Sequence, residues 1–230
     1  MKMKRLISFV IVLLLICGMP VSAFADTWYV DDGNITVNAT DSGQTVSQGE
    51  TTTPDDAPVI TQRDSSTPTT NTVTINAAEN AEANVTLSGV NIDTRGTHKA
   101  AVEIQGEGDV VIELDGSNTV QSGWERAGVE KNTSDPWGTN PGSGNGNLTI
   151  TDENETHGSL KATGGSLGAG IGGGSDCGDG SYITIEGNAK VTAKGGDYAA
   201  GIGGGESCDG SNITITGSAE VTATGGSMGA

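Results

Sequence analysis

The feature that most constrains this chain is a tandem repeat near its C-terminal end. Residues Gly164–Lys194 read GGSLGAGIGGGSDCGDGSYITIEGNAKVTAK, and residues Gly195–Thr224 read GGDYAAGIGGGESCDGSNITITGSAEVTAT. The two units are 31 and 30 residues long, with one residue lost near Gly178. Because glycines, β-branched triplets and cysteines all align, each unit is expected to bury its apolar side only by stacking on its neighbours.

Each unit contains three short segments that suit β-strands. In Ile183–Ile185 the isoleucines are predicted to point inward and Thr184 outward, because side chains alternate along a strand. Val191–Ala193 repeats this pattern, and the glycine-rich Ala169–Ile171 supplies a third wall. Weaker copies occur upstream at residues 101–104, 111–114, 118–120, 127–129, 148–150 and 160–162. The sequence therefore predicts an all-β parallel β-helix with three short strands per rung of about 30 residues; an array of β-sandwiches is the alternative.

Composition supports a narrow core. Glycine accounts for 37 of 230 residues, aromatic residues for only 3%, and both phenylalanines lie within the first 25 residues. A thin column of Ile, Val, Leu and Ala would explain these numbers. The formal net charge of −18 argues against binding to nucleic acid or to an anionic membrane surface. The acidic surface is interpreted as a solubility feature, with chelation of divalent cations as the alternative.

The N-terminal residues have the pattern of a secretory signal peptide. Lys2, Lys4 and Arg5 precede an apolar run over residues 6–16, and Ala-Phe-Ala ends at Ala25. The run is too short for a membrane span, which needs roughly 20 apolar residues. We therefore expect cleavage after Ala25 and a secreted or cell-surface protein. Residues 1–25 hold three basic and no acidic residues, so the mature net charge would be −21 rather than −18.

The rest of the chain is expected to contain two regions. Residues 26–72 are predicted to form N-terminal strands and a cap, with a Pro/Thr-rich loop over residues 50–70. Residues 73–230 are predicted to form the β-helix. Gly225–Ala230 repeats the first six residues of a unit, so we expect an incomplete last turn and a chain that is a fragment of a longer protein.

The repeats resemble those of a known group of surface proteins. Gly168–Gly196, with GAGIGGG, ITI and VTAKGG in order, is similar to repeats of bacterial, mostly Gram-positive, cell-surface proteins in the carbohydrate-binding, pectate-lyase-like right-handed β-helix group. Val85–Asp93 and Glu113–Gly123 resemble the less glycine-rich rungs of that group. The resemblance implies a right-handed β-helix, export and a polysaccharide or cell-surface glycan as partner.

Three aromatic residues are the candidate carbohydrate contacts. Trp124 and Trp137 lie in the least repetitive stretch, near Arg126 and Lys131, and Tyr198 is a further candidate. An exposed aromatic face beside polar side chains is a common sugar-binding surface. The alternative is that the indole rings cover part of the apolar column.

Acidic residues recur beside the cysteines of both units. Asp176 and Asp179 in one unit correspond to Glu206 and Asp209 in the next. Four carboxylates stacked at about 4.8 Å would repel one another unless water or a cation separated them. One interpretation of this cluster is a site for calcium as cofactor, since calcium takes six to eight oxygen ligands; a solvated turn is the alternative.

Cys177 and Cys208 occupy the same position in consecutive units. If one unit is one turn, their Cα atoms lie about 4.8 Å apart, inside the ~4.4–6.8 Å range of disulfides. Export would permit oxidation. Both a disulfide and two stacked thiols fit this placement.

No catalytic motif is evident in the sequence. The glycine-rich segments lack the lysine and the following helix of a phosphate-binding loop, and His98 and His157 are isolated along the chain. The leading hypothesis is therefore an exported, non-catalytic β-helix that binds carbohydrate or acts as an adhesin. A polysaccharide lyase or glycoside hydrolase and a structural surface stalk are the alternatives.

Overall fold

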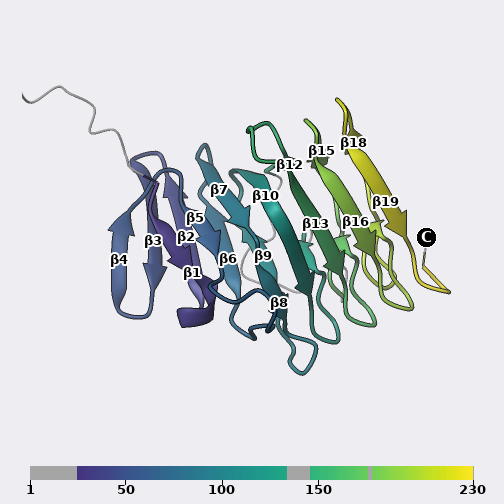
Figure 1. Cartoon of the computed structure of the whole chain (residues 1–230). Helices are drawn as coiled ribbons and strands as arrows, with labels where there is room; N and C mark the ends of the chain where they lie inside the picture. The colour runs from purple at the N-terminus through teal and green to yellow at the C-terminus, as the bar shows by residue number, and fades with distance from the viewer. Residues whose placement is uncertain (1–24, 134–145, 176–177, 230) are drawn as a thin grey trace, which may run out of the picture.

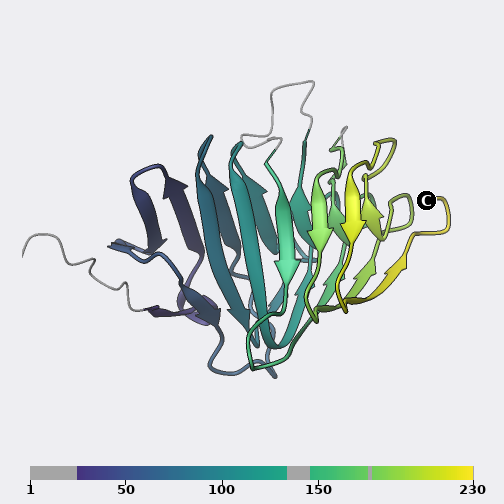
Figure 2. The same cartoon turned by 90° about the horizontal axis from the view of Figure 1, so that it is seen from above.

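The computed structural model describes residues 25–133, 146–175 and 178–229. These residues form a β-solenoid of about six turns, with about 31 residues per turn. Strands of successive turns stack side by side from β4 at one end to β18 and β19 at the other (Figure 1), and the view from above shows the turns following a single axis (Figure 2). The predicted parallel β-helix with three short strands per rung is confirmed.

Three sheets, named walls A, B and C, enclose the core. Wall A consists of β1 (Thr27–Tyr29), β5 (Val59–Thr61), β7 (Glu82–Ser88), the first part of β10 (Asp109–Gln121), β12 (Leu148–Thr151), β15 (Ile183–Ile185) and β18 (Ile213–Ile215). Wall C consists of β8 (Asn91–Asp93), the second part of β10, β13 (Gly158–Thr163), β16 (Lys190–Lys194) and β19 (Glu220–Thr224).

Wall B contains the one antiparallel segment among the described strands. It consists of β4 (Thr51–Pro54), β3 (Gly43–Gln48), β2 (Ile35–Thr40), β6 (Val73–Ala77), β9 (Val102–Gln105), β11 (Val129–Lys131), β14 (Ile171–Gly172) and β17 (Ile202–Gly203). Strands β2, β3 and β4 pair antiparallel, whereas the others pair in parallel. A short 3-10 turn, η2 (Val30–Asp32), joins β1 to β2.

The core is a column of aligned aliphatic side chains. Ile112 pairs with Ile150, which pairs with Ile185 on the next turn. Ile183 and Ile185 are fully buried while Thr184 between them is half-buried, so the predicted inward and outward orientations are confirmed. On wall B, glycine is required where a loop folds back: a Cβ added to Gly173 would lie 1.4 Å from the carbonyl oxygen of Gly178.

The corner between walls A and C joins neighbouring turns through a buried asparagine. Strand β10 bends at Gly116, whose φ of +60° favours glycine. Two residues later, the Asn118 side chain accepts a hydrogen bond from the Val90 N–H at 3.1 Å. It also donates to the carbonyl oxygen of Ser159 at 3.1 Å. One side chain therefore connects three successive turns.

The solenoid begins before Val73. β1 and β5 pair with β7 in wall A, and β2 pairs with β6 in wall B. The expectation of a loop over residues 50–70 is wrong in part, because β4 and β5 lie within it. Pro54 ends the edge strand β4, a position where a missing N–H is tolerated.

Side chains of the β3–β4 hairpin region satisfy backbone groups at this end of the solenoid. The side-chain amide of Gln44 makes the two hydrogen bonds to the Asn84 backbone that a neighbouring strand would make. Its Oε1 accepts from the Asn84 N–H at 2.9 Å, and its Nε2 donates to the Asn84 carbonyl at 3.0 Å. The buried Asp55 accepts from the indole N–H of Trp28 at 2.9 Å. These contacts leave the ends of β1 and β7 hydrogen-bonded.

Candidate functional site

The loops from wall C to wall B stack into a continuous edge, here called the C–B corner. It consists of residues 122–128, 164–170, 195–201 and 225–229, which strand register places above one another. Backbone bonds join the loops: the Leu167 N–H donates to the Trp124 carbonyl at 3.1 Å, and the Met228 N–H donates to the Asp197 carbonyl at 2.9 Å. Side chains on this corner are therefore spaced at intervals of one strand, about 4.8 Å.

Large apolar side chains lie on this corner in successive turns. Trp124 is 61% exposed, Tyr198 39% and Met228 68%, and Leu167 is half-buried. We call these four residues the apolar strip. The structure thus brings two of the sequence-predicted candidates, Trp124 and Tyr198, to one corner. Trp137 lies outside the described residues. Leu167 and Met228 were not predicted, although each follows a repeated Gly-Gly pair that places it in this loop.

A polar hollow of about 260 Å³ lies next to the loop that carries Trp124. The N–H of the preceding Gly123 donates to the carbonyl of Lys99 at 3.0 Å, and Arg126 Nη2 lies 3.0 Å from Glu103 Oε1. The residues lining the hollow are Thr72, His98, Lys99, Ala100, Glu103 and Arg126. Hydrogen-bond donors and acceptors therefore lie beside the loop that carries the exposed indole.

Beneath this corner lies a buried carboxyl group that sequence reasoning missed. Glu130 is on the outward face of β11, in register with Glu103, yet its side chain is only 1% exposed. Burial raises the pKa of Glu130 to about 7, even though the Arg126 guanidinium favours the ionised form. A carboxyl group at such depth is shielded from solvent. The outward position in the strand pattern gave no sign of this burial, because a loop from the next turn covers it.

The next residue, Lys131, occupies an inward position. It pairs with Ile104, so it continues a column that is aliphatic in the preceding turns. Burial lowers the pKa of Lys131 to about 8, although the negative charge of Asp109 favours the protonated form. Its Nζ lies 5.8 Å from the centroid of the Tyr182 ring, which stabilises the cation. Tyr182 itself precedes β15 and lies away from the apolar strip.

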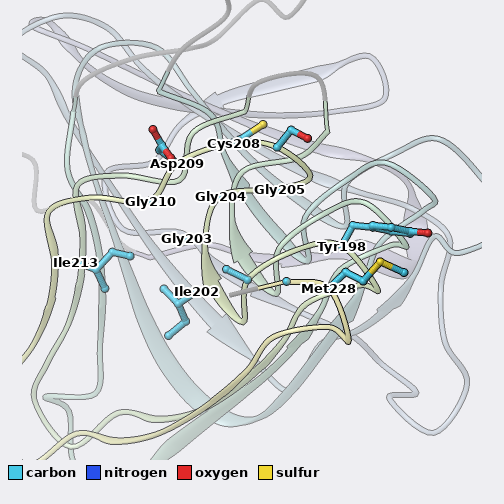
Figure 3. Close-up of a pocket in the computed structure, with 13 residues that line it drawn as sticks. Tyr198, Ile202, Gly203, Gly204, Gly205, Cys208, Asp209, Gly210, Ile213 and Met228 are labelled. Carbon is cyan, nitrogen blue, oxygen red and sulfur yellow. The ribbon is translucent and has the colours of Figure 1, made fainter.

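A second hollow, of about 550 Å³, lies at the last described turn. In Figure 3 the Tyr198 ring and Met228 stand at one end of this hollow, and Ile213 stands at the other. Ile202 projects between them, while Cys208 and Asp209 lie on the opposite rim (Figure 3). The apolar strip therefore continues to the edge of this hollow.

The predicted calcium ligands are only partly brought together. Asp179 and Asp209 lie on adjacent turns, and the Asp209 N–H donates to Asp179 Oδ1 at 2.8 Å. Glu206 is placed by its own N–H, which donates to the Leu167 carbonyl at 2.9 Å. Asp176 lies outside the described residues, and the described part of the chain contains no group of three or more potential metal ligands. Calcium binding stays a prediction.

The cysteine pair also stays a prediction. Cys177 lies outside the described residues, whereas Cys208 Sγ is 2.9 Å from the Glu206 carbonyl oxygen. A disulfide would join consecutive turns and stabilise the fold by roughly 3 kcal/mol through loop closure. For protein purified without reductant we expect a mass about 2 Da below that of the dithiol, because two hydrogen atoms are lost when the disulfide forms. Alkylation of both thiols without prior reduction would contradict the disulfide.

Comparisons with known protein families, with curated proteins and with solved structures give no match for this chain. The likeness to Gram-positive surface repeats therefore depends on the sequence motifs, whereas the solenoid fold is shown by the structure. No helix within the described ranges is long and apolar enough to cross a membrane.

Proposed function

We propose that this chain is an exported surface protein that binds carbohydrate, without catalysis, along the C–B corner. The observation that carries the proposal is the apolar strip, because it places an exposed indole and an exposed phenol on the same corner of the solenoid, one residue out of register with each other. Trp124 and Tyr198 lie on turns that are two strand spacings apart, or about 10 Å along the solenoid axis. Such spacing suits a saccharide chain that lies along the solenoid axis.

The surroundings of the strip also favour a saccharide. Sugars present apolar ring faces and many hydroxyl groups, so their sites combine an aromatic surface with hydrogen-bonding side chains. The polar hollow beside the loop that carries Trp124 offers Lys99, His98, Arg126 and the acceptor Glu103. A rigid backbone under the strip would reduce the entropy lost on binding. Adhesion to a glycan-covered surface follows from the same contacts, repeated along the strip.

We expect Trp124→Ala to weaken glycan binding while leaving the Tm nearly unchanged. Trp124 is 61% exposed, so its truncation removes little core contact, whereas loss of an aromatic anchor costs roughly tenfold or more in affinity. Binding is measured on an array of cellulose, xylan, mannan, pectin and chitin oligosaccharides, and Tm by circular dichroism. Tyr198→Ala should act in the same direction.

Thr192→Ala is the matched control, because Thr192 lies on the outward face of wall C away from the strip. It should change neither quantity. A large fall in Tm for Trp124→Ala, with unchanged array binding, would instead assign the indole a covering role and contradict the proposal.

The alternative of a polysaccharide-cleaving enzyme has one observation in its favour. A groove of about 600 Å³ crosses the corner between walls A and C and is lined by Ser117, Ser159 and Ser218. Beside this groove, Oδ2 of the buried Asp152 lies 3.4 Å from Nδ1 of His157. This arrangement can orient a histidine base. New reducing ends or unsaturated products from the array oligosaccharides would favour this alternative.

A further inference from the structure

We propose that Glu130 is a positioning residue for the carbohydrate-binding corner, and that its ionised carboxylate holds Arg126 and the Trp124 loop in the arrangement that binds. This inference rests on the proposed function. It assigns a role to a residue that cannot itself touch the ligand, because its side chain is 1% exposed.

The Glu130 carboxylate contacts the Trp124 loop at two points. Its Oε1 lies 2.6 Å from Arg126 Nη2, and its Oε2 accepts from the Ala127 N–H at 2.9 Å. Arg126 also reaches Glu103 Oε1 at 3.0 Å, so its guanidinium bridges two carboxylates. Because Trp124 lies two residues before Arg126, the carboxylate fixes the end of the loop that presents the indole.

The same carboxylate is tied to the next turn. Glu130 Oε1 accepts from Asn132 Nδ2 at 3.0 Å, and Asn132 Oδ1 in turn accepts from the Gly174 N–H at 2.9 Å. Gly174 lies against the carboxylate so closely that an added Cβ would be 2.9 Å from Oε2. The segment after β14 therefore closes over Glu130, and the carboxylate joins this segment to the Trp124 loop.

The charges around Glu130 determine how pH acts on this arrangement. Arg126 from the loop favours the ionised form, while Glu103 from β9 and burial favour the neutral form. The adjoining loops also carry Glu125, His98 and Lys99, with Glu125 Oε2 3.6 Å from His98 Nδ1, and Lys131 faces the interior. Glu130 changes its charge near neutrality. Because hydrogen bonds to an ionised group are stronger than those to a neutral one, protonation loosens Arg126 and Ala127.

The first test needs no ligand. Amide spectra of ¹⁵N-labelled full-length protein are recorded from pH 5.5 to 8.5, and the signals of the Ala127 amide and of the Trp124 indole N–H are followed. Both should shift with a midpoint near neutrality in the wild type and stay constant in Glu130→Gln. Glu103→Gln, which removes the other carboxylate on Arg126, should retain the transition. Static signals in the wild type would overturn the inference.

The second test uses the oligosaccharide array at pH 8 and pH 6. Wild-type binding to neutral oligosaccharides should fall several-fold at pH 6, while Glu130→Gln should bind at the lower level at both pH values. Equal wild-type binding at both pH values, or full binding by Glu130→Gln, would overturn the positioning role. If no oligosaccharide binds at either pH but the Ala127 and Trp124 signals still titrate, the proposed function fails and the positioning of the loop by Glu130 stands.

Discussion

Replacing Ile185 by aspartate is expected to abolish cooperative unfolding of the solenoid. Ile185 is fully buried and lies between Ile150 of the preceding turn and Ile215 of the next. A carboxylate at this position would have apolar neighbours on both sides, and burying an unpaired charge costs several kcal/mol. Since a domain is stable by only ~5–15 kcal/mol, the loss should appear as a broad or absent transition in thermal circular dichroism.

Thr184→Asp is the matched control for this change. Thr184 is one residue away, is half-buried on the outer face, and has Thr149 and Thr214 beside it in the register. The new carboxylate can reach water there, so the free energy of unfolding should change by roughly 1 kcal/mol or less. Equal tolerance of the two substitutions would show that the inward and outward faces have been assigned incorrectly.

The repeat made this part of the fold predictable. Its period sets which residues stack, and the alternation within Ile183–Ile185 sets which of them face the core, so the register follows without further information. The strands within residues 50–70 were harder to predict, because a Thr-rich segment that contains prolines has no clear strand pattern. There β5 is a strand because β1 and β7 pair with it on both sides, a contact between segments distant in sequence.

The candidate site was only partly predictable, for a related reason. An exposed aromatic residue in a non-repetitive stretch is visible in the sequence, and Trp124 was found in this way. The burial of Glu130 depends on the segment around Gly174, which lies one turn away and has no side chain to signal the contact. In the sequence Lys131 is merely a polar neighbour of the candidate aromatic residues, and only its pairing with Ile104 places it on the inward column.

The second large effect concerns the dependence of stability on pH. Burial raises the pKa of Glu130 from 4.5 to about 7, so between these values the folded protein binds more protons than the unfolded chain. The free energy of unfolding should therefore decrease as pH rises from about 4.5 to about 7. At about 1.4 kcal/mol for each tenfold change in proton affinity, the loss is roughly 3 kcal/mol.

Lys131 acts in the opposite direction at higher pH. Its pKa is lowered from 10.5 to about 8, so between these values the folded protein binds fewer protons than the unfolded chain. Stability should increase again as pH rises above about 8. The two residues together place a minimum in the free energy of unfolding between about pH 7 and pH 8, which urea titrations at a series of pH values can locate.

Glu130→Gln is expected to make the protein more stable at pH 8, by as much as ~3 kcal/mol, although it removes an ion pair with Arg126. Glutamine has the shape of the protonated glutamic acid and can still accept from Ala127, so it avoids burying a charge while keeping the packing. The free energy of unfolding of the variant should match that of the wild type near pH 4.5 and exceed it progressively up to pH 7.

Lower stability than the wild type at pH 8 would mean that the Arg126 pair outweighs the burial of the carboxylate. Greater stability combined with weaker glycan binding would show that the solenoid keeps a destabilising charge at position 130 because that charge orders the Trp124 loop.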